Sequence, residues 1–382
     1  MFDINREIQD TKARLCLDCG KCTSICPVAS YQPDFNPRLI VQRRLGYKGS
    51  DQQDDTIWSC ISCYMCVERC NYSVGFPEFI NALRYEACSD GYQVQCSHGG
   101  ALQSLTHMMT GEDMHQNRLG WLPRDISVSN ESDTLFFVGC APYFDVIFTD
   151  LGVNTLEGIK GSLRLLNHAE VPFKLLDNER CCGHDLLMQG DREGFLALAR
   201  ANIKEFSCHG IKRIITSCPE GHHMFKIEYP KILGETGIEV LHLTEVIAPL
   251  VQSGELKLGK LKKRVTYHDP CRLGRYARIF EQPRIALQAV ADLEFVEMEQ
   301  NRERSLCCGA SPWAHCGPVN RQIQEQRLAQ AEATEADILV TACPKCQIHL
   351  KCAQKHGGSD ISQINILDLA ALLSLSLDKE VK

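Results

Sequence analysis

The sequence is poor in several features that would each point to a class of protein. Its 382 residues include only 3 tryptophans, and no apolar run reaches the roughly 18 residues that a transmembrane helix needs. The opening MFDINREIQD is charged and lacks the apolar stretch of a secretory signal peptide. No G-x-G-x-x-G motif follows a predicted strand, and a net charge of −7 disfavours nucleic acid as a partner. These absences predict a cytoplasmic protein that binds neither a dinucleotide nor a nucleic acid.

The residue in excess is cysteine, of which there are 22. A secreted disulfide scaffold would be short and would carry a signal peptide. Cysteines in this number therefore indicate metal binding in a reducing compartment.

Eight of the cysteines form two runs with the spacing C-x2-C-x2-C-x3-C, namely Cys16, Cys19, Cys22 and Cys26, then Cys60, Cys63, Cys66 and Cys70. In two-cluster ferredoxins with this spacing, the fourth cysteine of each run ligates the other run's cluster. We therefore predict two [4Fe–4S] cubane clusters, one held by Cys16, Cys19, Cys22 and Cys70, the other by Cys60, Cys63, Cys66 and Cys26. Zinc, the alternative, takes its four ligands in pairs and fits a four-cysteine run given twice poorly.

Helices are predicted between and after these runs. Residues 36–46 (NPRLIVQRRLG) have proline near the start and apolar residues between basic ones. Residues 77–87 (PEFINALRYEA) place Phe79, Ile80 and Leu83 on one stripe. The pattern predicts an α-helical ferredoxin domain. Asn71 stands where the second run would usually carry proline, which removes no ligand.

The rest of the chain consists of two similar halves. Apolar runs at 135–140, 214–219, 265–271 and 338–344 predict short strands that each deliver a cysteine, and helical patterns at 191–206 and 320–334 lie between them. Strands alternating with helices predict parallel sheets, and the repeat indicates a duplication. The predicted fold is an α+β multidomain chain with a ferredoxin domain at 1–95, a linker at 96–131, a first lobe at 132–262 and a second lobe at 263–382. Residues 364–377 are expected to form an amphipathic C-terminal helix.

Each half contains a CCG triplet, at 181–183 and 307–309. Loops that follow parallel strands gather at one edge of the sheet, so the second half should bring together Cys271, Cys307, Cys308, Cys343 and Cys346. The first half supplies only Cys140, Cys181, Cys182 and Cys218, because Gly221 aligns with Cys346. Four thiolates suffice for an ordinary [4Fe–4S] cluster. An empty first site is the alternative, and His222 or His223 is a candidate for the missing ligand.

The pattern C-x(n)-C-C-G-x(n)-C-P-x-C resembles the CCG domain of the B-type subunit of heterodisulfide reductase, and the N-terminal part resembles its C-type partner. A chain that carries both is similar to the fused D-type form, and the resemblance covers nearly the whole sequence. It implies Rossmann-like α/β lobes and a non-cubane [4Fe–4S] cluster on the five cysteines of the second lobe, where a disulfide or thiol reacts. YHDPCRLGR at 267–275 matches the family's approach to the first ligand.

Several residues near the second CCG triplet have two interpretations each. We expect Cys307 and Cys308 to carry the chemistry with His268, which either gives a proton to a leaving thiolate or donates a hydrogen bond to cluster sulfur. Arg272 and Arg275 either attract an anionic substrate and raise the cluster potential or are solvated residues at a helix start. His184 and Trp313 are expected to be structural, Cys316 to lie near the site, and Cys88, Cys96, Cys208 and Cys352 to be plain thiols.

The predicted function is that of an iron–sulfur subunit of a heterodisulfide reductase-like complex. A flavin-containing or other iron–sulfur partner, with a membrane protein as a further partner, would dock near 16–26 or 60–70. Electrons would pass the two cubane clusters to the five-cysteine cluster, which reduces a disulfide or oxidises thiols. The CCG pair also occurs in iron–sulfur subunits of flavin-dependent lactate, glycolate and glycerol-3-phosphate dehydrogenases. A relay of electrons to quinone, or a non-catalytic electron conduit, is therefore the alternative.

Overall fold

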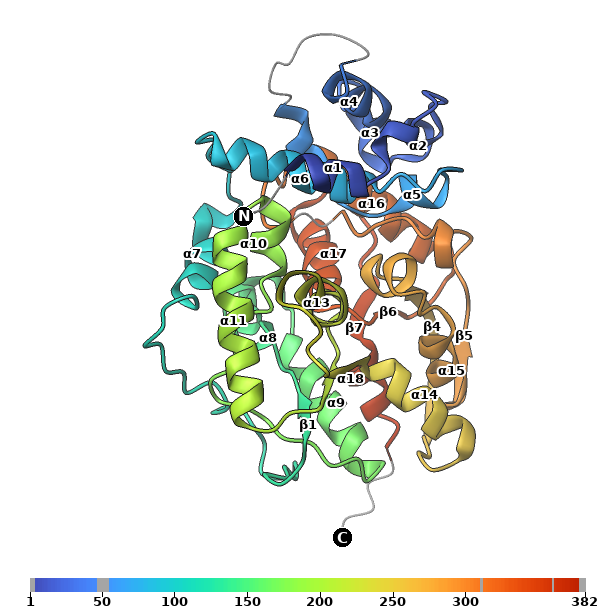
Figure 1. The fold of residues 1–382 in the computed structure, drawn as a ribbon. Helices are drawn as coiled ribbons and strands as arrows, with labels where there is room; N and C mark the ends of the chain where they lie inside the picture. The colour runs from blue at the N-terminus through green and yellow to red at the C-terminus, as the bar shows by residue number, and fades with distance from the viewer. Residues whose placement is uncertain (1–3, 47–54, 310–311, 359–360, 378–382) are drawn as a thin grey trace.

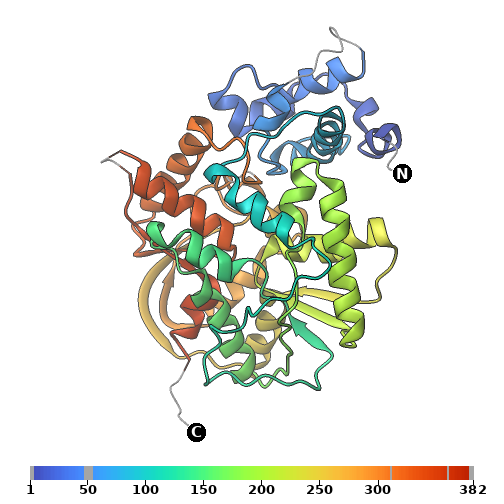
Figure 2. The same cartoon turned by 90° about the vertical axis from the view of Figure 1, so that its left-hand side faces the viewer.

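The computed structural model describes residues 4–46, 55–309, 312–358 and 361–377. A helical N-terminal region, coloured blue, lies on top of two α/β lobes that stand side by side (Figures 1 and 2). The strands of both lobes pair in parallel, so the predicted combination of a helical ferredoxin region with α/β repeats is confirmed. Within the described ranges, no helix is both long and apolar enough to cross a membrane.

The N-terminal region consists of short helices separated by the cysteine loops. They are α1 (Ile4–Asp10), η1 (Ala13–Leu15), α2 (Lys21–Ile25), α3 (Pro27–Tyr31), α4 (Pro37–Arg44), η2 (Asp55–Ser59), α5 (Met65–Glu68) and α6 (Phe76–Ser89). Both predicted helices are present as α4 and α6. Asn36 caps α4, because its side chain accepts a hydrogen bond from the backbone of Leu39 at 3.2 Å. Phe79 and Ile80 of α6 are fully buried and anchor the region.

The segment 96–131, predicted as a linker, contains η3 (His98–Gly100) and α7 (Ala101–Met108). Gln103 donates a hydrogen bond to the carbonyl oxygen of Trp313 at 2.7 Å, and Arg118 donates one to that of Glu179 at 2.7 Å. The segment therefore packs on both lobes as well as joining them to the N-terminal region.

The first lobe is a parallel sheet of order β1–β2–β3, formed by β1 (Thr134–Phe136), β2 (Arg213–Thr216) and β3 (Glu239–His242). Leu135 packs in one apolar cluster with Phe195 of α11, while its neighbour Phe136 packs in another with Leu163 of α9. The sheet is thus covered on both faces. The helices are α8 (Ala141–Ile147), η4 (Thr149–Leu151), α9 (Thr155–His168), α10 (His184–Gln189), α11 (Arg192–Cys208), α12 (Pro219–His223), η5 (Met224–Glu228), α13 (Tyr229–Leu233) and α14 (Leu243–Ser253).

The second lobe repeats this plan with one more strand. Its parallel sheet has the order β5–β4–β6–β7, with β4 (Lys260–His268), β5 (Ala291–Phe295), β6 (Ile338–Thr341) and β7 (Asn365–Asp368). In the first lobe, the place of β5 is taken by a single parallel bridge between Leu135 and Lys174. The helices are η6 (Arg272–Tyr276), α15 (Glu281–Gln288), η7 (Arg302–Arg304), α16 (Pro318–Glu332), α17 (Pro344–His356) and α18 (Leu369–Ser374).

One predicted element is wrong. Residues 364–377 do not form one amphipathic helix, since Asn365–Asp368 is strand β7 and the helix α18 begins only at Leu369. Asp368 separates the strand from the helix, because its side chain accepts a hydrogen bond from the backbone of Ala370 at 2.8 Å and caps α18. Pairing with β6 outweighs the helical pattern of the apolar residues before it.

The two lobes pack closely on each other through α9 and α18. A Cβ atom at Gly158 would lie 2.8 Å from the Cγ atom of Asp368, and one at Gly161 would overlap the carbonyl oxygen of Ala370. Glycine at both positions lets the helices approach. On the other side, α14 packs on α15. The lobes therefore form one packed unit, with the N-terminal region above both.

Candidate metal centres

The eight cysteines of the N-terminal region line two neighbouring cavities. Cys16, Cys19, Cys22 and Cys70 line one, called here the outer site, and Cys66 also reaches it. Cys26, Cys60, Cys63 and Cys66 line the other, called the inner site. The fold thus brings the fourth cysteine of each run to the other run's first three, as the spacing predicts. Left-handed backbone at Gly20 and Tyr64, the residues just before α2 and α5, turns each loop around its cavity.

The two sites differ in burial. Cys19 is exposed and Cys16, Cys22 and Cys70 are half-buried, whereas Cys26, Cys60, Cys63 and Cys66 are buried. Burial, followed by the charges of neighbouring cysteines, raises the pKa of the Cys66 thiol well above its usual range. Iron would reverse this, because a bound metal ion deprotonates its thiol ligands. The sulfur-only donor sets fit [4Fe–4S] clusters.

The five cysteines of the second lobe, called the second CCG site, form a continuous series. The thiol of Cys307 contacts those of Cys271 and Cys308, and the thiol of Cys346 contacts those of Cys308 and Cys343. Hydrogen bonds from Cys307 and Cys346 lower the pKa of the Cys308 thiol to about 6. Five sulfur donors from three loops, one of which is readily ionised, fit an iron–sulfur cluster with more ligands than a cubane takes.

His268 lies at the end of β4, fully buried, beside this series. One of its ring nitrogens lies within 4.8 Å of the Sγ atoms of Cys308 and Cys346. Arg327 of α16 donates a hydrogen bond from Nε to Nδ1 of His268 at 3.0 Å. Burial, followed by the charge of Arg327, lowers the pKa of His268 well below its usual range. The imidazole is therefore neutral.

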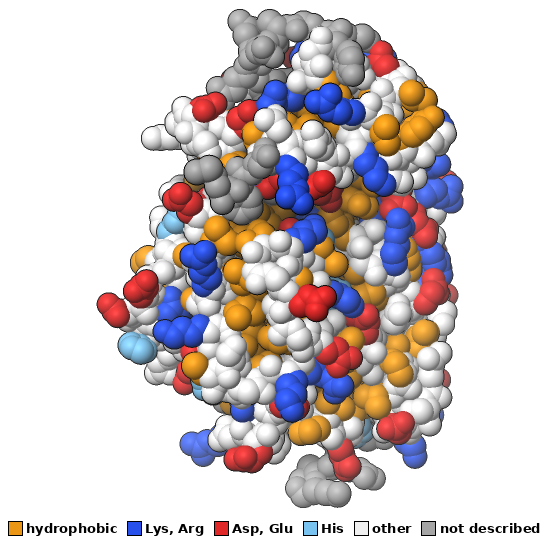
Figure 3. Space-filling view, viewed as in Figure 1, with side chains coloured by type: hydrophobic (Ala, Val, Ile, Leu, Met, Phe, Trp, Pro, Cys, Tyr) orange, Lys and Arg blue, Asp and Glu red, His pale blue; other side chains and the backbone are white. Residues whose placement is uncertain are grey.

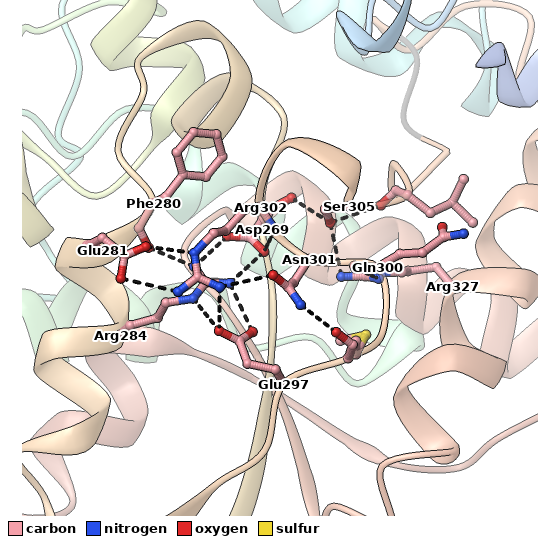
Figure 4. A network of polar contacts seen from close by, with 12 residues as sticks. Asp269, Phe280, Glu281, Arg284, Glu297, Gln300, Asn301, Arg302, Ser305 and Arg327 are labelled. Carbon is pink, nitrogen blue, oxygen red and sulfur yellow. Dashed lines mark hydrogen bonds and ion pairs between the residues drawn. The ribbon is translucent and has the colours of Figure 1, made fainter. Parts of the chain in front are cut away.

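A polar network fixes the loop that leads from His268 to Cys271 (Figure 4). Asp269 receives two hydrogen bonds from the guanidinium of Arg284, at 2.7 and 2.9 Å, and Arg284 also binds Glu297. The backbone of Arg302 donates to the same carboxylate at 2.9 Å. These charge-assisted bonds hold the first ligand loop and the approach to the CCG triplet in one geometry.

The first CCG site has four cysteines. The thiol of Cys181 contacts those of Cys140 and Cys182, and Cys218 lies close enough to Cys182 to raise the pKa of its thiol. Gly221 occupies the position of Cys346, and a Cβ atom there would meet only ordinary contacts, the nearest being Thr216 Oγ1 at 3.7 Å. Four sulfur donors fit an ordinary cubane cluster.

Each candidate for a fifth ligand in the first lobe has one ring nitrogen beside a carboxylate. His222 Nε2 lies 3.2 Å from Glu245, and His223 Nε2 lies 3.2 Å from Glu228. Burial lowers the pKa of His223 to about 4. A carboxylate thus holds one nitrogen of each ring, while Nδ1 of His222 is buried and has no hydrogen-bond partner among the described residues.

A buried ionic group joins the two CCG sites. Lys345, between Cys343 and Cys346, forms ion pairs with Asp185 and, at 2.9 Å, with Glu220. His184 Nδ1 lies 3.0 Å from Asp185. His184, Asp185 and Glu220 have the donors of a metal site, but the Lys345 ammonium already pairs with both carboxylates. The group is therefore an ion-pair network between lobes, and His184 is structural as expected.

Two buried arginines connect the inner site to the lobes. Arg275 donates from Nε to the carbonyl oxygen of Cys63 at 2.6 Å and from Nη1 to that of Ser305 at 2.6 Å. Arg84 donates to the carbonyl oxygens of Cys60 at 2.7 Å and Met188 at 2.9 Å. Arg275 thus links the inner site to the second lobe, and Arg84 links it to the first.

Other predicted residues have clear places. Arg272 and Arg275 are 5 % and 1 % exposed, so their interpretation as solvated residues is wrong. Trp313 is buried and stacks on His349 at 5.1 Å between ring centroids, which confirms it as core. Cys316 is exposed and lines a separate polar cleft with Cys96. Cys88 and Cys352 are half-buried, and Cys208 is exposed.

Sequence reasoning missed Arg84, Arg327, Glu179 and the Lys345 network. Glu179 is fully buried and accepts hydrogen bonds from the backbone of Gly139 at 2.9 Å and of Val138 at 3.4 Å, just before Cys140. Only the network had a signal in the sequence, because the alignment that pairs Gly221 with Cys346 also pairs Glu220 with Lys345. Opposite charges at equivalent positions of two repeats can meet near the axis that relates them.

Comparison with protein families agrees with this division of the chain. A 4Fe-4S dicluster domain matches residues 12–74, and a cysteine-rich CCG domain matches residues 134–226 and again 265–351. The chain is 29 % identical to the D-type subunit of dihydromethanophenazine:CoB–CoM heterodisulfide reductase from Methanosarcina barkeri, over 93 % of this chain and 92 % of that protein.

Other relatives are longer proteins. The chain is 31 % identical to a probable iron–sulfur-binding oxidoreductase of Bacillus subtilis, over 90 % of this chain and 48 % of that protein. It is 27 % identical to EtfAB:quinone oxidoreductase of Syntrophomonas wolfei, over 94 % of this chain and 57 % of that protein. Among solved structures, a hypothetical protein from Helicobacter pylori shares the fold, with a TM-score of 0.50 and 11 % identity over 86 % of this chain and 63 % of that chain.

Proposed function

Because the chain is a heterodisulfide reductase-like iron–sulfur protein, we propose that it conducts electrons from a partner protein to the second CCG site, where a disulfide is reduced or thiols are oxidised. It would hold cubane clusters at the outer, inner and first CCG sites and a non-cubane [4Fe–4S] cluster at the second, in a Rossmann-like lobe. The observation that carries the proposal is the unbroken series of five buried or half-buried thiols in the second lobe.

Electron exchange with the partner takes place at the outer site. Its surroundings expose Leu15, Leu17 and Tyr72 by 49 %, 66 % and 45 %. Figure 3 shows hydrophobic side chains at the edge of the N-terminal region, where Figure 1 places α2, with lysines and arginines nearby. An apolar patch with a basic rim suits a flavin-containing or iron–sulfur subunit whose own docking face is apolar and acidic. Such a partner would hold the chain in the cytoplasm or at a membrane surface.

The inner site is the branch point of the electron path. The thiol of Cys63 lies close enough to those of Cys271 and Cys307 for a charge on one thiol to shift the pKa of another. Arg275 donates hydrogen bonds to carbonyl oxygens on both sides, at Cys63 of the inner site and at Ser305 of the second lobe. A buried guanidinium also favours added electrons at the sulfur ligands around it. Arg84 supports the corresponding path from the inner site to the first lobe.

At the second CCG site the reaction is the cleavage of one S–S bond. It consumes two electrons and two protons and yields two thiols, and in the opposite direction two thiols release them. The cluster, when bound, supplies the one-electron steps and a sulfur-binding metal. Arg272 lies directly after Cys271, with its guanidinium 4.0 Å from the Tyr276 ring and no ion-pair partner among the described residues. It supports an anionic substrate.

The alternative is a relay to quinone, in which the second CCG site conducts electrons and touches no substrate sulfur. The similarity to EtfAB:quinone oxidoreductase of Syntrophomonas wolfei favours it. The two functions differ in whether thiols bind at the site. An oxidised, fully loaded chain titrated with anionic thiols should give a new paramagnetic signal that Cys308→Ala abolishes. Unchanged spectra at all thiol concentrations, together with quinone-dependent oxidation of the reduced chain, would favour the relay.

A further inference from the structure

His268 lies beside the second CCG site with one of its two ring nitrogens left without a hydrogen-bond partner in the described part of the chain. Its Nε2 atom is buried and has no hydrogen-bond partner among the described residues, while Nδ1 accepts the hydrogen bond from Arg327. With Nδ1 occupied, the ring presents Nε2 to the thiols of Cys308 and Cys346, which lie within 4.8 Å of a ring nitrogen. The ring therefore faces the space between these two thiols.

Arg327 decides the chemical character of this nitrogen. A guanidinium donates hydrogen bonds and accepts none, so Nδ1 must carry the lone pair. The neutral imidazole then carries its proton on Nε2, where no lone pair is available for iron. A doubly protonated ring would set an N–H group against the N–H of Arg327. Geometry alone thus makes Nε2 a hydrogen-bond donor.

Arg327 is itself held in this position. It donates to the carbonyl oxygen of Gln300 at 2.9 Å and to the hydroxyl of Ser305 at 3.0 Å (Figure 4), and to Gln330 at 2.8 Å. Ser305 stands two residues before Cys307, and its carbonyl oxygen binds Arg275. The guanidinium cannot turn away from His268 without breaking bonds to three groups, so the tautomer is locked by the fold.

The first lobe lacks this arrangement. Aligning Cys140 with Cys271 places Phe137 at the position of His268. Phe137 is buried and packs against Phe225, with ring centroids 4.6 Å apart. Its edge also lies 3.9 Å from where a Cβ atom at Gly221 would stand. The apolar ring and the missing fifth thiol thus occur together, as do the histidine and the complete site.

We propose that His268 is a positioning residue that donates a hydrogen bond from Nε2 to a sulfur at the second CCG site, in a tautomer locked by Arg327, and neither ligates iron nor serves as the proton donor. The proposal rests on a cluster at this site but not on the disulfide as its substrate. A hydrogen bond to sulfur stabilises the more negative, reduced state and so raises the reduction potential. A cluster in the first lobe would lack this increase in reduction potential, because Phe137 cannot donate a hydrogen bond.

The test is an anaerobic potential titration of the loaded chain, followed by paramagnetic resonance, on three variants. His268→Phe copies the first lobe and should weaken one-electron reduction of this cluster about tenfold, which is about 59 mV. His268→Gln should remain near the wild-type potential, because its amide oxygen can accept from Arg327 while its amide nitrogen donates to sulfur. The matched control Phe137→Leu in the first lobe should leave the second-site potential unchanged.

Isotopic labelling separates the donor from a ligand. In chain labelled with 15N-histidine, the reduced second-site cluster should show only weak nitrogen coupling that His268→Phe removes. Strong coupling, or loss of about four irons in His268→Gln, would show iron ligation and overturn the proposal. An equal potential in wild type and both His268 variants would overturn it too. If wild type holds no cluster at this site, the proposed function fails as well, which iron analysis detects separately.

Discussion

The two CCG lobes both consist of a parallel sheet with the same order of cysteine motifs, and they differ at three equivalent positions around their cysteines. Where the second lobe has Cys346, His268 and Lys345, the first has Gly221, Phe137 and Glu220. The first two differences remove a thiol and a polar nitrogen from the first site. The third places opposite charges where the lobes meet, and these pair at 2.9 Å. Both copies thus keep a scaffold that gathers cysteines, and under the proposed function the second copy is specialised for chemistry and the first for conduction.

The largest expected effect is on the rate of disulfide reduction, which should differ between variants of the two CCG sites. Cys308→Ala removes the thiol that contacts two others, and we expect disulfide reduction by the assembled complex to fall to background. The matched variant Cys182→Ala should retain part of the activity, since the inner site also reaches the second lobe directly through Arg275. Each variant should lose about four of some 16 irons per chain. Equal loss of activity in both variants would contradict the division of roles.

The second prediction concerns the charges between the lobes. Lys345→Met would leave the partly buried Asp185 and Glu220 without their cation, and we expect it to destabilise the chain by about 3 kcal/mol. Adding Asp185→Asn and Glu220→Gln should recover most of that stability. Thermal and denaturant unfolding of the loaded chain measures both. Little change in the single variant would mean that the network is solvated and does not hold the lobes together.

A third, smaller effect compares the caps of the last helix in each lobe. Burial raises the pKa of Asp368 from 3.8 to about 6, so the folded state binds its proton more tightly than the unfolded state does. This contribution to stability is fully present below about pH 4 and is lost as pH rises through 6.

Between pH 5.5 and 8, wild type should therefore lose about 1 kcal/mol that Asp368→Asn keeps. In the first lobe the cap is His242, and burial lowers its pKa from 6.5 to about 3, so the unfolded state binds a proton that the folded state does not. The contribution of His242 to stability should therefore rise by about 1 kcal/mol between pH 5.5 and 8, and His242→Asn should remove this rise. Parallel profiles of wild type and Asp368→Asn would contradict the assignment.

The smallest change in stability is expected where the first lobe is rebuilt to match the second. Gly221→Cys fits without strain and should alter the free energy of unfolding by about 1 kcal/mol or less. We expect this single change to leave the paramagnetic resonance spectrum of the first-site cluster close to that of wild type, because Phe137 still occupies the place of His268. Adding Phe137→His should shift it towards the second-site spectrum. A full conversion by Gly221→Cys alone would show that the fifth thiol is the whole difference.

The apolar patterns were enough to predict the helical region and the parallel lobes, and the cysteine spacing predicted which sulfurs meet, because each of these signals depends on a few residues close together in the chain. Contacts between distant segments left no such trace. Arg327 binds His268, 59 positions away in the sequence, and Arg275 binds Cys63, 212 positions away. The residues near either arginine in the sequence do not indicate its partner. The strand at 365–368 was missed for the same reason, since its partner β6 and not its own pattern decides its conformation.

The different burial of the outer and inner sites also determines which cluster oxidants should destroy first. The outer site has one exposed and three half-buried cysteines, whereas every cysteine of the inner site is buried beneath it. Oxidation of sulfur follows exposure, so oxygen should destroy the outer cluster first. The chain would then be disconnected from its electron supply while its reacting end remained intact. An air-inactivated preparation should accordingly recover when a single cluster is rebuilt, and the site of damage would also be the site of repair.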